Sequence, residues 1–138
     1  FAGLTAAIEA RNAGASVVVL EKMPTYGGNS IINGGDFAAA GNALQRAAGV
    51  QDSPEQMLKD MLKAGASLNH LALARTVAER SNEALEWTQT YVGARYVKLN
   101  FHGGHSVKRS VQCAGGSGAE LVNKLLQKAL SLGVKSAG

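Results

Sequence analysis

The sequence predicts an α/β fold with parallel strands, and three observations support this prediction. Residues 3–13 carry small and apolar side chains at helical spacing, and Gly14 follows as a residue that ends helices in the left-handed conformation. Residues 16–20 form an uninterrupted run, SVVVL, typical of a parallel strand that is covered on both faces. Glu21 comes directly after this run. A helix, a strand and an acid at the strand tip indicate the second half of a dinucleotide-binding βαβ unit.

The first residues fit the pyrophosphate turn of such a unit. Gly3 stands where a G-x-G-x-x-G turn has its third glycine, and Ala2 lies in the turn with its amide near the phosphate. In such units an acid roughly 20 residues after the turn accepts hydrogen bonds from a ribose 2′-hydroxyl, and Glu21 lies close to that distance from Gly3. An acid at this place repels a 2′-phosphate, so binding of NADP is disfavoured. A nicotinamide dehydrogenase and a methyltransferase remain open on this half-motif. Since no strand and no G-x-G precede it, we expect the chain to be a fragment of a larger enzyme.

Composition narrows the class of protein. A hydrophobic fraction of 46%, a mean hydropathy of -0.02 and no apolar run of membrane-spanning length predict a soluble protein, cytoplasmic or periplasmic, with no membrane span. The net charge of +4 is spread along the chain, so we expect no nucleic-acid partner. Cys113 is the single cysteine and has no placed base. The three histidines lack the spacing of metal ligands, so no metal site is predicted.

Glycine pairs mark the places where a ligand could approach the main chain. They occur at 27–28, 34–35, 103–104 and 115–116, and each pair alone fits a simple turn as well as a ligand contact. Lys22 to Tyr26 is expected to be a loop. Residues 27–41 show no clean period and are expected to form a glycine-rich loop followed by a short helical or irregular stretch over a ligand.

The middle of the chain predicts helices. Residues 53–65 begin at Ser53, continue with Pro54 and form a capping box with Gln56. The apolar stripe of this helix consists of Met57, Leu58, Met61 and Leu62.

Two further helices are expected over 71–80, with Asn69 or His70 at its start, and over 81–92, with Leu85 and Trp87 as anchors. No strand pattern separates these helices, so residues 53–93 are expected to be a mainly helical insertion or capping segment.

The last third predicts strand, loop, helix and strand. Residues 95–101 alternate weakly as a strand, and 103–109 form a loop. Residues 118–132 form an amphipathic helix that Gly133 ends, and a strand begins at Val134. The buried side of that helix is expected to carry Leu121, Leu125 and Leu132.

Longer motifs identify a family resemblance. The segments EKMPTYGGNSIINGGD, DSPEQMLKD and GGHSVKR resemble the flavoprotein subunits of the fumarate reductase and succinate dehydrogenase family. The resemblance is closest to the soluble flavocytochrome c and fumarate reductase branch and covers nearly the whole chain. It implies a partial Rossmann-like FAD-binding domain, truncated at both ends over residues 1–138, with the start of a helical capping segment.

The resemblance also implies FAD as the cofactor and assigns residues to it. Ala2 and Gly3 lie at the pyrophosphate turn, and Glu21, followed by Lys22, holds the adenosine ribose. Gly28, Asn29 and Ser30 lie at the phosphate and ribityl region. Gly34 and Gly35 bring main chain to the isoalloxazine, where amide donors tune the flavin.

The implied activity is hydride transfer between flavin N5 and the activated C=C bond of a small carboxylate substrate. The alternatives are an aspartate oxidase, a urocanate reductase, a ketosteroid dehydrogenase, or a fragment that is not catalytic. The isolated chain itself is expected to be inactive and to bind FAD poorly, because the central strand and the first glycines of the motif are absent. Family residues that clamp the substrate and deliver the proton lie beyond Gly138, so no catalytic residue is assigned here. His105 is expected to be a loop histidine or, less favoured, a substrate contact. Asp36 is expected to be a solvated loop acid or a polar contact, and His102 has no evident partner.

Overall fold

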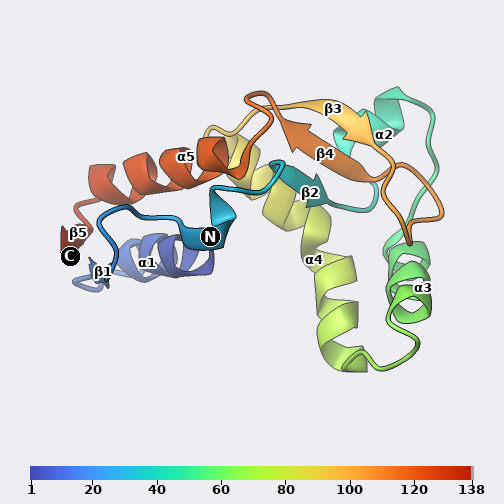
Figure 1. The fold of residues 1–138 in the computed structure, drawn as a ribbon, viewed down its shortest axis with the longest axis horizontal. Coiled ribbons are helices and arrows are strands. Elements are labelled where there is room, and N and C mark those ends of the chain that lie inside the picture. The colour runs from blue at the N-terminus through green and yellow to red at the C-terminus, as the bar shows by residue number, and fades with distance from the viewer. Residues whose placement is uncertain (138) are drawn as a thin grey trace.

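The computed structural model describes residues 1–137, and it contains two small sheets with helices packed around them (Figure 1). This mixed architecture confirms the α/β prediction. In chain order the elements are α1 (Ala2–Asn12), β1 (Val18–Leu20), the 3₁₀ turn η1 (Gly28–Ser30), β2 (Asp36–Ala38), α2 (Ala43–Ala47), α3 (Pro54–Ala64), α4 (Leu71–Thr90), β3 (Tyr96–Asn100), β4 (Ser110–Cys113), α5 (Gly118–Ser131) and β5 (Lys135–Ala137).

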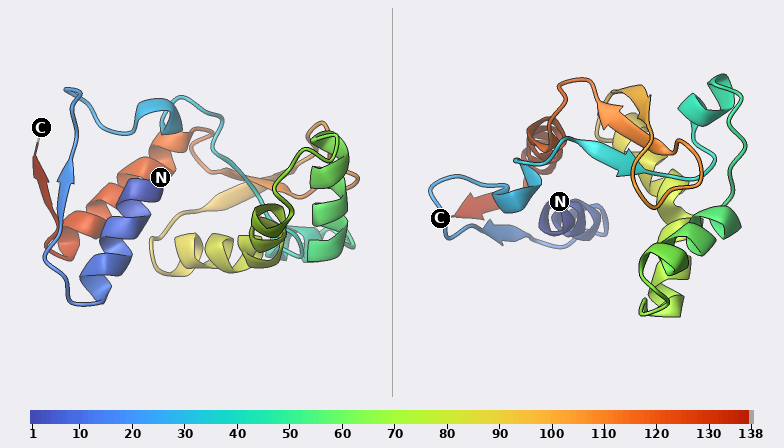
Figure 2. Two further views of the ribbon diagram at one scale, coloured as in Figure 1. Left: turned by 90° about the horizontal axis from the view of Figure 1, so that it is seen from below. Right: turned by 45° about the vertical axis from the view of Figure 1, so that its right-hand side comes forward.

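One end of the molecule is a parallel pair of strands covered by two helices. β1 and β5 pair in parallel, with Val18 opposite Lys135 and Leu20 opposite Ala137. Helices α1 and α5 lie side by side against this pair (Figure 2, left). Their C-terminal ends are joined by Arg11, whose Nε donates to the carbonyl of Leu132 at 2.8 Å. This arrangement brings the N-terminus of α1 to the carboxyl ends of both strands, where dinucleotides bind in such folds.

The strand predicted over 16–20 is real, but it is not covered on both faces. Val18 is 56% exposed and Leu20 is 79% exposed, because these two side chains point to the face of β1 away from the core, whereas Val17 and Val19 pack against the core. The prediction of a fully buried strand is therefore wrong for this chain.

The other end is a three-stranded antiparallel sheet in the order β2-β4-β3. The prediction of a strand at 95–101 is confirmed by β3. The sequence analysis does not predict β2 or β4. Residues 27–41, which contain β2, are expected to form a loop and a helical or irregular stretch, and no element is assigned to the residues of β4. Both strands are too short, at three and four residues, to show a clear alternation of apolar and polar positions.

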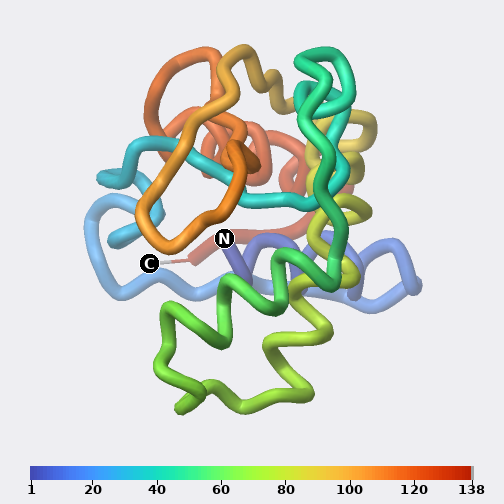
Figure 3. Tube along the Cα trace, turned by 90° about the vertical axis from the view of Figure 1, so that its right-hand side faces the viewer, coloured from blue at the N-terminus to red at the C-terminus, as the bar shows by residue number. Residues whose placement is uncertain are grey.

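Helices α3 and α4 pack along each other and extend as a hairpin from the rest of the molecule (Figures 1 and 3). Met57, Leu58, Ala74 and Ala78 form the small core between them. The expected break near residue 81 does not occur, because α4 runs continuously to Thr90. Ser81 is accommodated inside the helix, where its hydroxyl donates to the carbonyl of Ala78 at 3.1 Å.

The ends of these helices follow the predicted signals in part. The side chain of Ser53 accepts from the amide of Gln56 at 3.2 Å, so the cap of α3 is confirmed. The side chain of Gln56 does not complete the capping box, since it donates to Asp60 and Ser106 instead. His70, not Asn69, caps α4 through its ring nitrogen.

The main core lies where α1, α4 and α5 meet the antiparallel sheet. Ile8 of α1, Leu85 of α4, Val111 of β4 and Leu125 of α5 are all at most 3% exposed. The buried positions Leu121 and Leu125 confirm the predicted face of α5, and Leu132 packs against its edge. No helix within residues 1–137 is both long and apolar enough to cross a lipid bilayer.

Candidate functional site: a cavity at the carboxyl ends of the parallel strands

A cavity of about 320 Å³ lies where the N-terminus of α1 meets the ends of β1 and β5. Gly3, Glu21 and Gly28, three of the residues predicted from the sequence, line it together. Its apolar walls come from both strands and both helices, and consist of Phe1, Leu4, Val19, Leu20, Tyr26, Val122 and Leu126. A concave apolar site with a few polar groups is typical of ligand pockets, and its volume is within the roughly 300–1,000 Å³ that they occupy.

Glu21 stands at the rim of this cavity at the tip of β1. Its backbone amide donates to the carbonyl of Ala137 at 3.0 Å, which extends the parallel ladder by one residue and fixes the position of Glu21. Its Oε1 accepts from the amide of Met23 at 3.1 Å, while Oε2 has no partner within residues 1–137. The carboxylate therefore keeps acceptor capacity for a hydroxyl pair of a ligand.

The first turn of α1 offers donors to the same space. The first hydrogen bond of the helix runs from the amide of Thr5 to the carbonyl of Phe1, so the amides of Ala2, Gly3 and Leu4 precede it and have no helical acceptor. A Cβ atom at Gly3 would meet no atom within 4 Å, so open space lies beside the Cα of this residue, which lines the cavity. Free amides and the positive end of a helix dipole favour a phosphate group there.

The loop of residues 27–35, here called the glycine loop, closes one side of the cavity. The nitrogen of Phe1 lies 3.2 Å from the hydroxyl of Ser30, which places η1 next to the start of α1. Gly28 has a φ of +48° with open space beside its Cα. Asn29 is exposed, with no side-chain hydrogen bond within residues 1–137. The turn predicted to bind pyrophosphate and the residues predicted to contact phosphate are thus neighbours in space.

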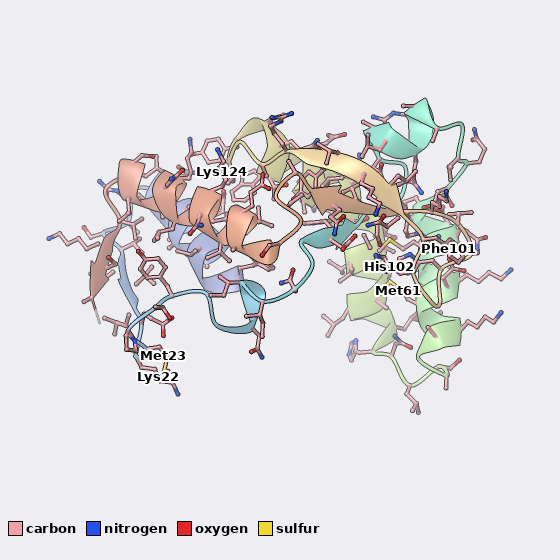
Figure 4. All side chains as sticks on the ribbon, turned by 45° about the horizontal axis from the view of Figure 1, so that its top comes forward. Lys22, Met23, Met61, Phe101, His102 and Lys124 are labelled. Carbon is pink, nitrogen blue, oxygen red and sulfur yellow. The ribbon has the colours of Figure 1, made fainter. Side chains whose placement is uncertain are left out.

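Ala2, Asn29 and Ser30 adjoin residues that line the cavity but do not line it themselves, and the same is true of Lys22. Lys22 is exposed, and Figure 4 shows it with Met23 at the end of the loop after β1, pointing away from the helices. Its role in cofactor binding remains a prediction.

The second predicted glycine pair lies near a different cavity. Gly35 and Asp36 line a space of about 340 Å³ between the antiparallel sheet and helices α1, α4 and α5. Gly35 has a φ of +71°, and a Cβ there would lie 2.7 Å from the backbone of Ser117. Glycine is therefore required at position 35 by contact with the turn before α5. Phe1 lines both cavities, so they meet at the start of α1.

The polar residues near this second cavity differ in part from expectation. Asp36 is exposed but lies in β2 and not in a loop, and it is a polar contact: its Oδ1 accepts from Nδ2 of Asn100 at 2.8 Å and lies 3.2 Å from Nε2 of His102. His102 thus has a partner, contrary to the sequence prediction (Figure 4 marks it beside Phe101). Burial first, and then the nearby charge of Arg109, lower the pKa of His105. The ring Nδ1 of His105 is buried and unpartnered within residues 1–137.

A buried ion cluster was not anticipated from the sequence. Arg109 donates from Nε and Nη2 to the two oxygens of Asp52 at 3.0 and 2.9 Å. Its Nη1 lies 2.7 Å from Oδ2 of Asp60, as an ion pair and not as an aligned hydrogen bond. Arg109 lies 57 positions from Asp52 in the sequence and is distant from Asp60 as well, so no local motif could have revealed the cluster. It fixes the loop before β4 onto the start of α3 and has no place in either cavity.

Desolvation raises the pKa of Asp60, but hydrogen bonds from the amide and hydroxyl of Ser106, together with Arg109, outweigh it and lower the pKa to about 2. The carboxylate is therefore ionised at any physiological pH. A buried carboxylate that is fully paired holds structure and is not available as a proton donor.

The residues around the first cavity fit one end of a flavin adenine dinucleotide. A carboxylate with free acceptor capacity suits a ribose, and unpaired helix amides suit a pyrophosphate. Glycines without a Cβ leave the main chain accessible at positions 3 and 28. The arrangement can hold an adenosine diphosphate group, while the described residues include no cluster of side chains that could bind a metal ion.

Comparison with known proteins supports the same assignment. The FAD binding domain family matches residues 1–136. The acrylate reductase flavoprotein subunit of Shewanella woodyi is 46% identical over 135 residues, which cover 97% of this chain and 27% of that relative. The fumarate reductase (cytochrome) of Shewanella frigidimarina is 37% identical over 131 residues, covering 94% of this chain and 23% of that protein.

A solved structure extends the likeness to three dimensions. The open conformation of a flavocytochrome c3 fumarate reductase superposes with a TM-score of 0.93 at 34% identity, over 98% of this chain and 24% of that one. The chain thus spans about a quarter of the length of its curated relatives. Its fold, its cavity and these matches agree, and the chain belongs to the FAD binding domain family of fumarate-reductase-like flavoproteins.

Proposed function

We propose that this chain is the adenosine and pyrophosphate part of the FAD site in a reductase of the size of its relatives. The observation that carries the proposal is the position of Glu21, which ends a parallel strand beside the free amides of α1 and lines one cavity with Gly3 and Gly28. Ala2 and Gly3 would hold the pyrophosphate, Glu21 the ribose, and Asn29 and Ser30 the phosphate and ribityl region. Gly34 and Gly35 would present main chain to the flavin ring.

When bound, FAD would supply hydride transfer at N5 to the activated C=C bond of a small carboxylate substrate. Relatives named acrylate reductase and fumarate reductase support this substrate class. The residues of this chain bind and orient the cofactor, and its apolar walls keep water from the adenosine end. The mainly helical segment over residues 53–93 is proposed to be an insertion that flanks this site.

The proposal is tested by measuring which flavins the complete protein binds. Isothermal titration with FAD and with FMN separates the contribution of the adenosine end, because FMN lacks it. We expect FAD to bind at least about tenfold more tightly than FMN, which corresponds to ~1.4 kcal/mol. Equal affinities for FAD and FMN would contradict the proposal.

Glu21 is tested by a matched pair of variants. Glu21→Gln keeps the size of the side chain but replaces one acceptor oxygen by a donor, so FAD affinity is expected to fall by about tenfold. Glu9→Gln is the control, because Glu9 lies exposed on α1 and outside the first cavity. Reduction of acrylate and fumarate by the FAD-loaded protein, with a reduced dye as electron donor, then tests the substrate class.

A further inference from the structure

We infer that the turn before α5 positions the glycine loop, and that Gln112, Ser117 and Gly118 are positioning residues for the flavin. This inference rests on the proposed function, and it assigns a role to residues that do not line the first cavity. Its basis is a set of contacts that all reach the glycine loop from one side.

Several carbonyl groups of the glycine loop accept hydrogen bonds from this turn and from β4. The hydroxyl of Ser117 donates to the carbonyl of Ile31 at 3.1 Å, and the amide of Gly118 donates to that of Asn33 at 3.0 Å. Nε2 of Gln112 donates to the carbonyl of Gly34 at 3.0 Å. Carbonyls that are hydrogen-bonded on one side hold the peptide planes of the loop in one orientation.

The fourth carbonyl of the set is also bonded. The amide of Cys113 donates to the carbonyl of Gly35 at 2.9 Å, which joins the end of the glycine loop to β4. Within the loop, Asn33 bridges two positions, since Nδ2 donates to the carbonyl of Ser30 and Oδ1 accepts from the amide of Gly35. The loop is therefore fixed from within as well as from the turn.

Three amide groups in the middle of the same loop have no partner among the described residues, and all three belong to exposed residues. The N–H groups of Ile32, Asn33 and Gly34 donate to no acceptor in the part of the chain that the structure describes. Unpaired backbone donors are costly unless water or a ligand accepts from them. Donors fixed in advance at a flavin ring stabilise the electron-rich reduced form without a cost of reorganisation when charge develops.

Gly118 makes this arrangement possible by its lack of a side chain. A Cβ there would clash with the carbonyl oxygen of Ser30 and would lie 2.6 and 2.7 Å from the amide atoms of Asn33. Gly118 is the first residue of α5 and has no positive φ, so its backbone would accept alanine. The requirement for glycine at position 118 therefore comes from contact with the glycine loop alone.

The experiment uses the complete flavoenzyme with four variants. Gly118→Ala displaces the loop by steric contact, and Gln112→Met removes one donor from a partly exposed side chain without a change of charge. The control for the first is Gly103→Ala, where an added Cβ would meet no atom within 4 Å. The control for the second is Gln89→Met on α4, which lines neither cavity.

The readouts are FAD affinity, the visible absorbance spectrum of the bound flavin, its midpoint potential and, in the absence of FAD, the exchange of the hydrogen-bonded amides of Gly35, Cys113 and Gly118. We expect Gly118→Ala to weaken FAD binding by about tenfold or more and Gln112→Met by about threefold. Both should shift the spectrum, lower the potential and speed exchange, while both controls match the wild type.

Two results would overturn the inference. One is a normal spectrum and potential in both Gly118→Ala and Gln112→Met. The other is a change in Gly103→Ala of the same size as in Gly118→Ala. Failure of the proposed function is distinguishable, because the wild-type protein itself would then bind no FAD. If the wild-type protein binds no FAD, amide exchange still tests the positioning role. Exchange in Gly118→Ala that is faster than in the wild type would support this role, and exchange that is unchanged or slower would refute it.

Discussion

In the half of the chain built from α1, β1, β5 and α5, polar groups face open space, whereas in the half that contains α3 and β4 they are buried against one another. Glu21 keeps an unpaired carboxylate oxygen beside a cavity, and the first amides of α1 have no acceptor among residues 1–137. Arg109 is 1% exposed and contacts two buried carboxylates. Unpaired groups at a cavity indicate a ligand, and paired groups in a core indicate structure.

The comparison predicts its largest effect at Arg109. Arg109→Met leaves the carboxylates of Asp52 and Asp60 buried without their cation, which is expected to cost about 3–5 kcal/mol of the free energy of unfolding. Urea unfolding followed by circular dichroism measures this loss.

Arg75→Met is the matched control for this variant. Arg75 and Glu79 lie 3.7 Å apart on α4 with side chains that are each 54% exposed, so losing this pair should cost no more than ~0.5 kcal/mol. Equal losses in the two variants would mean that the buried cluster is no more important than a surface pair.

The half built from α1, β1, β5 and α5 was easier to predict from the sequence than the half that contains α3 and β4, for a physical reason. The βαβ pattern is local, so α1, the strand tip and Glu21 could be placed from neighbouring residues. The buried cluster is not local, since Arg109 and Asp52 are 57 positions apart and nothing near either residue indicates the other. Only the folded chain brings them together.

The elements that were missed have similar causes. Ser81 and Asn82 favour helix ends, which predicted a break, but the hydroxyl of Ser81 bonds within α4 and lies in the core with Met57. β2 is three residues long and gains its stability from pairing with β4. The approach of Gly35 to a flavin stays a prediction, and the steric contact of this residue with the backbone of Ser117 was not visible in the sequence.

The second-largest effect is expected at Asp60, in the half that contains α3 and β4, where acid should lower the free energy of unfolding. The pKa of Asp60 is lowered to about 2, from 3.8, so its contribution to stability is complete above pH 4 and is lost as the pH falls towards 2. Asp60→Asn removes hydrogen bonds to a charged group, which is expected to cost about 1.5–3 kcal/mol at neutral pH. Its unfolding free energy should then decline less steeply than that of the wild type between pH 4 and 2. An unchanged slope in acid titrations would show that another carboxylate governs this range.

A smaller effect is expected at Tyr96. Its hydroxyl lies 3.0 Å from that of Thr88, which already donates to the carbonyl of Leu85, so Tyr96 is the donor of this pair. Tyr96→Phe should cost about 1 kcal/mol at neutral pH. Burial raises the pKa of Tyr96 to about 12, so folding is favoured below pH 10 and loses this contribution as the pH rises to 12. Stability curves of the two proteins should therefore converge in alkali, and parallel curves would exclude Tyr96 as the titrating group.

The smallest effect is expected at Glu21, in the half where polar groups remain open. Its side chain accepts one local hydrogen bond from Met23 and contacts no buried charge, so Glu21→Gln should change the free energy of unfolding without FAD by less than ~0.5 kcal/mol. The same variant is expected to lose FAD affinity, so stability and binding separate at this residue. Thermal unfolding with and without excess FAD measures both, because a ligand that binds only the folded protein stabilises it by an amount that grows with the logarithm of the ligand concentration divided by Kd. A large loss without FAD would place Glu21 with Arg109 among the structural residues, and the contrast between the two halves would fail.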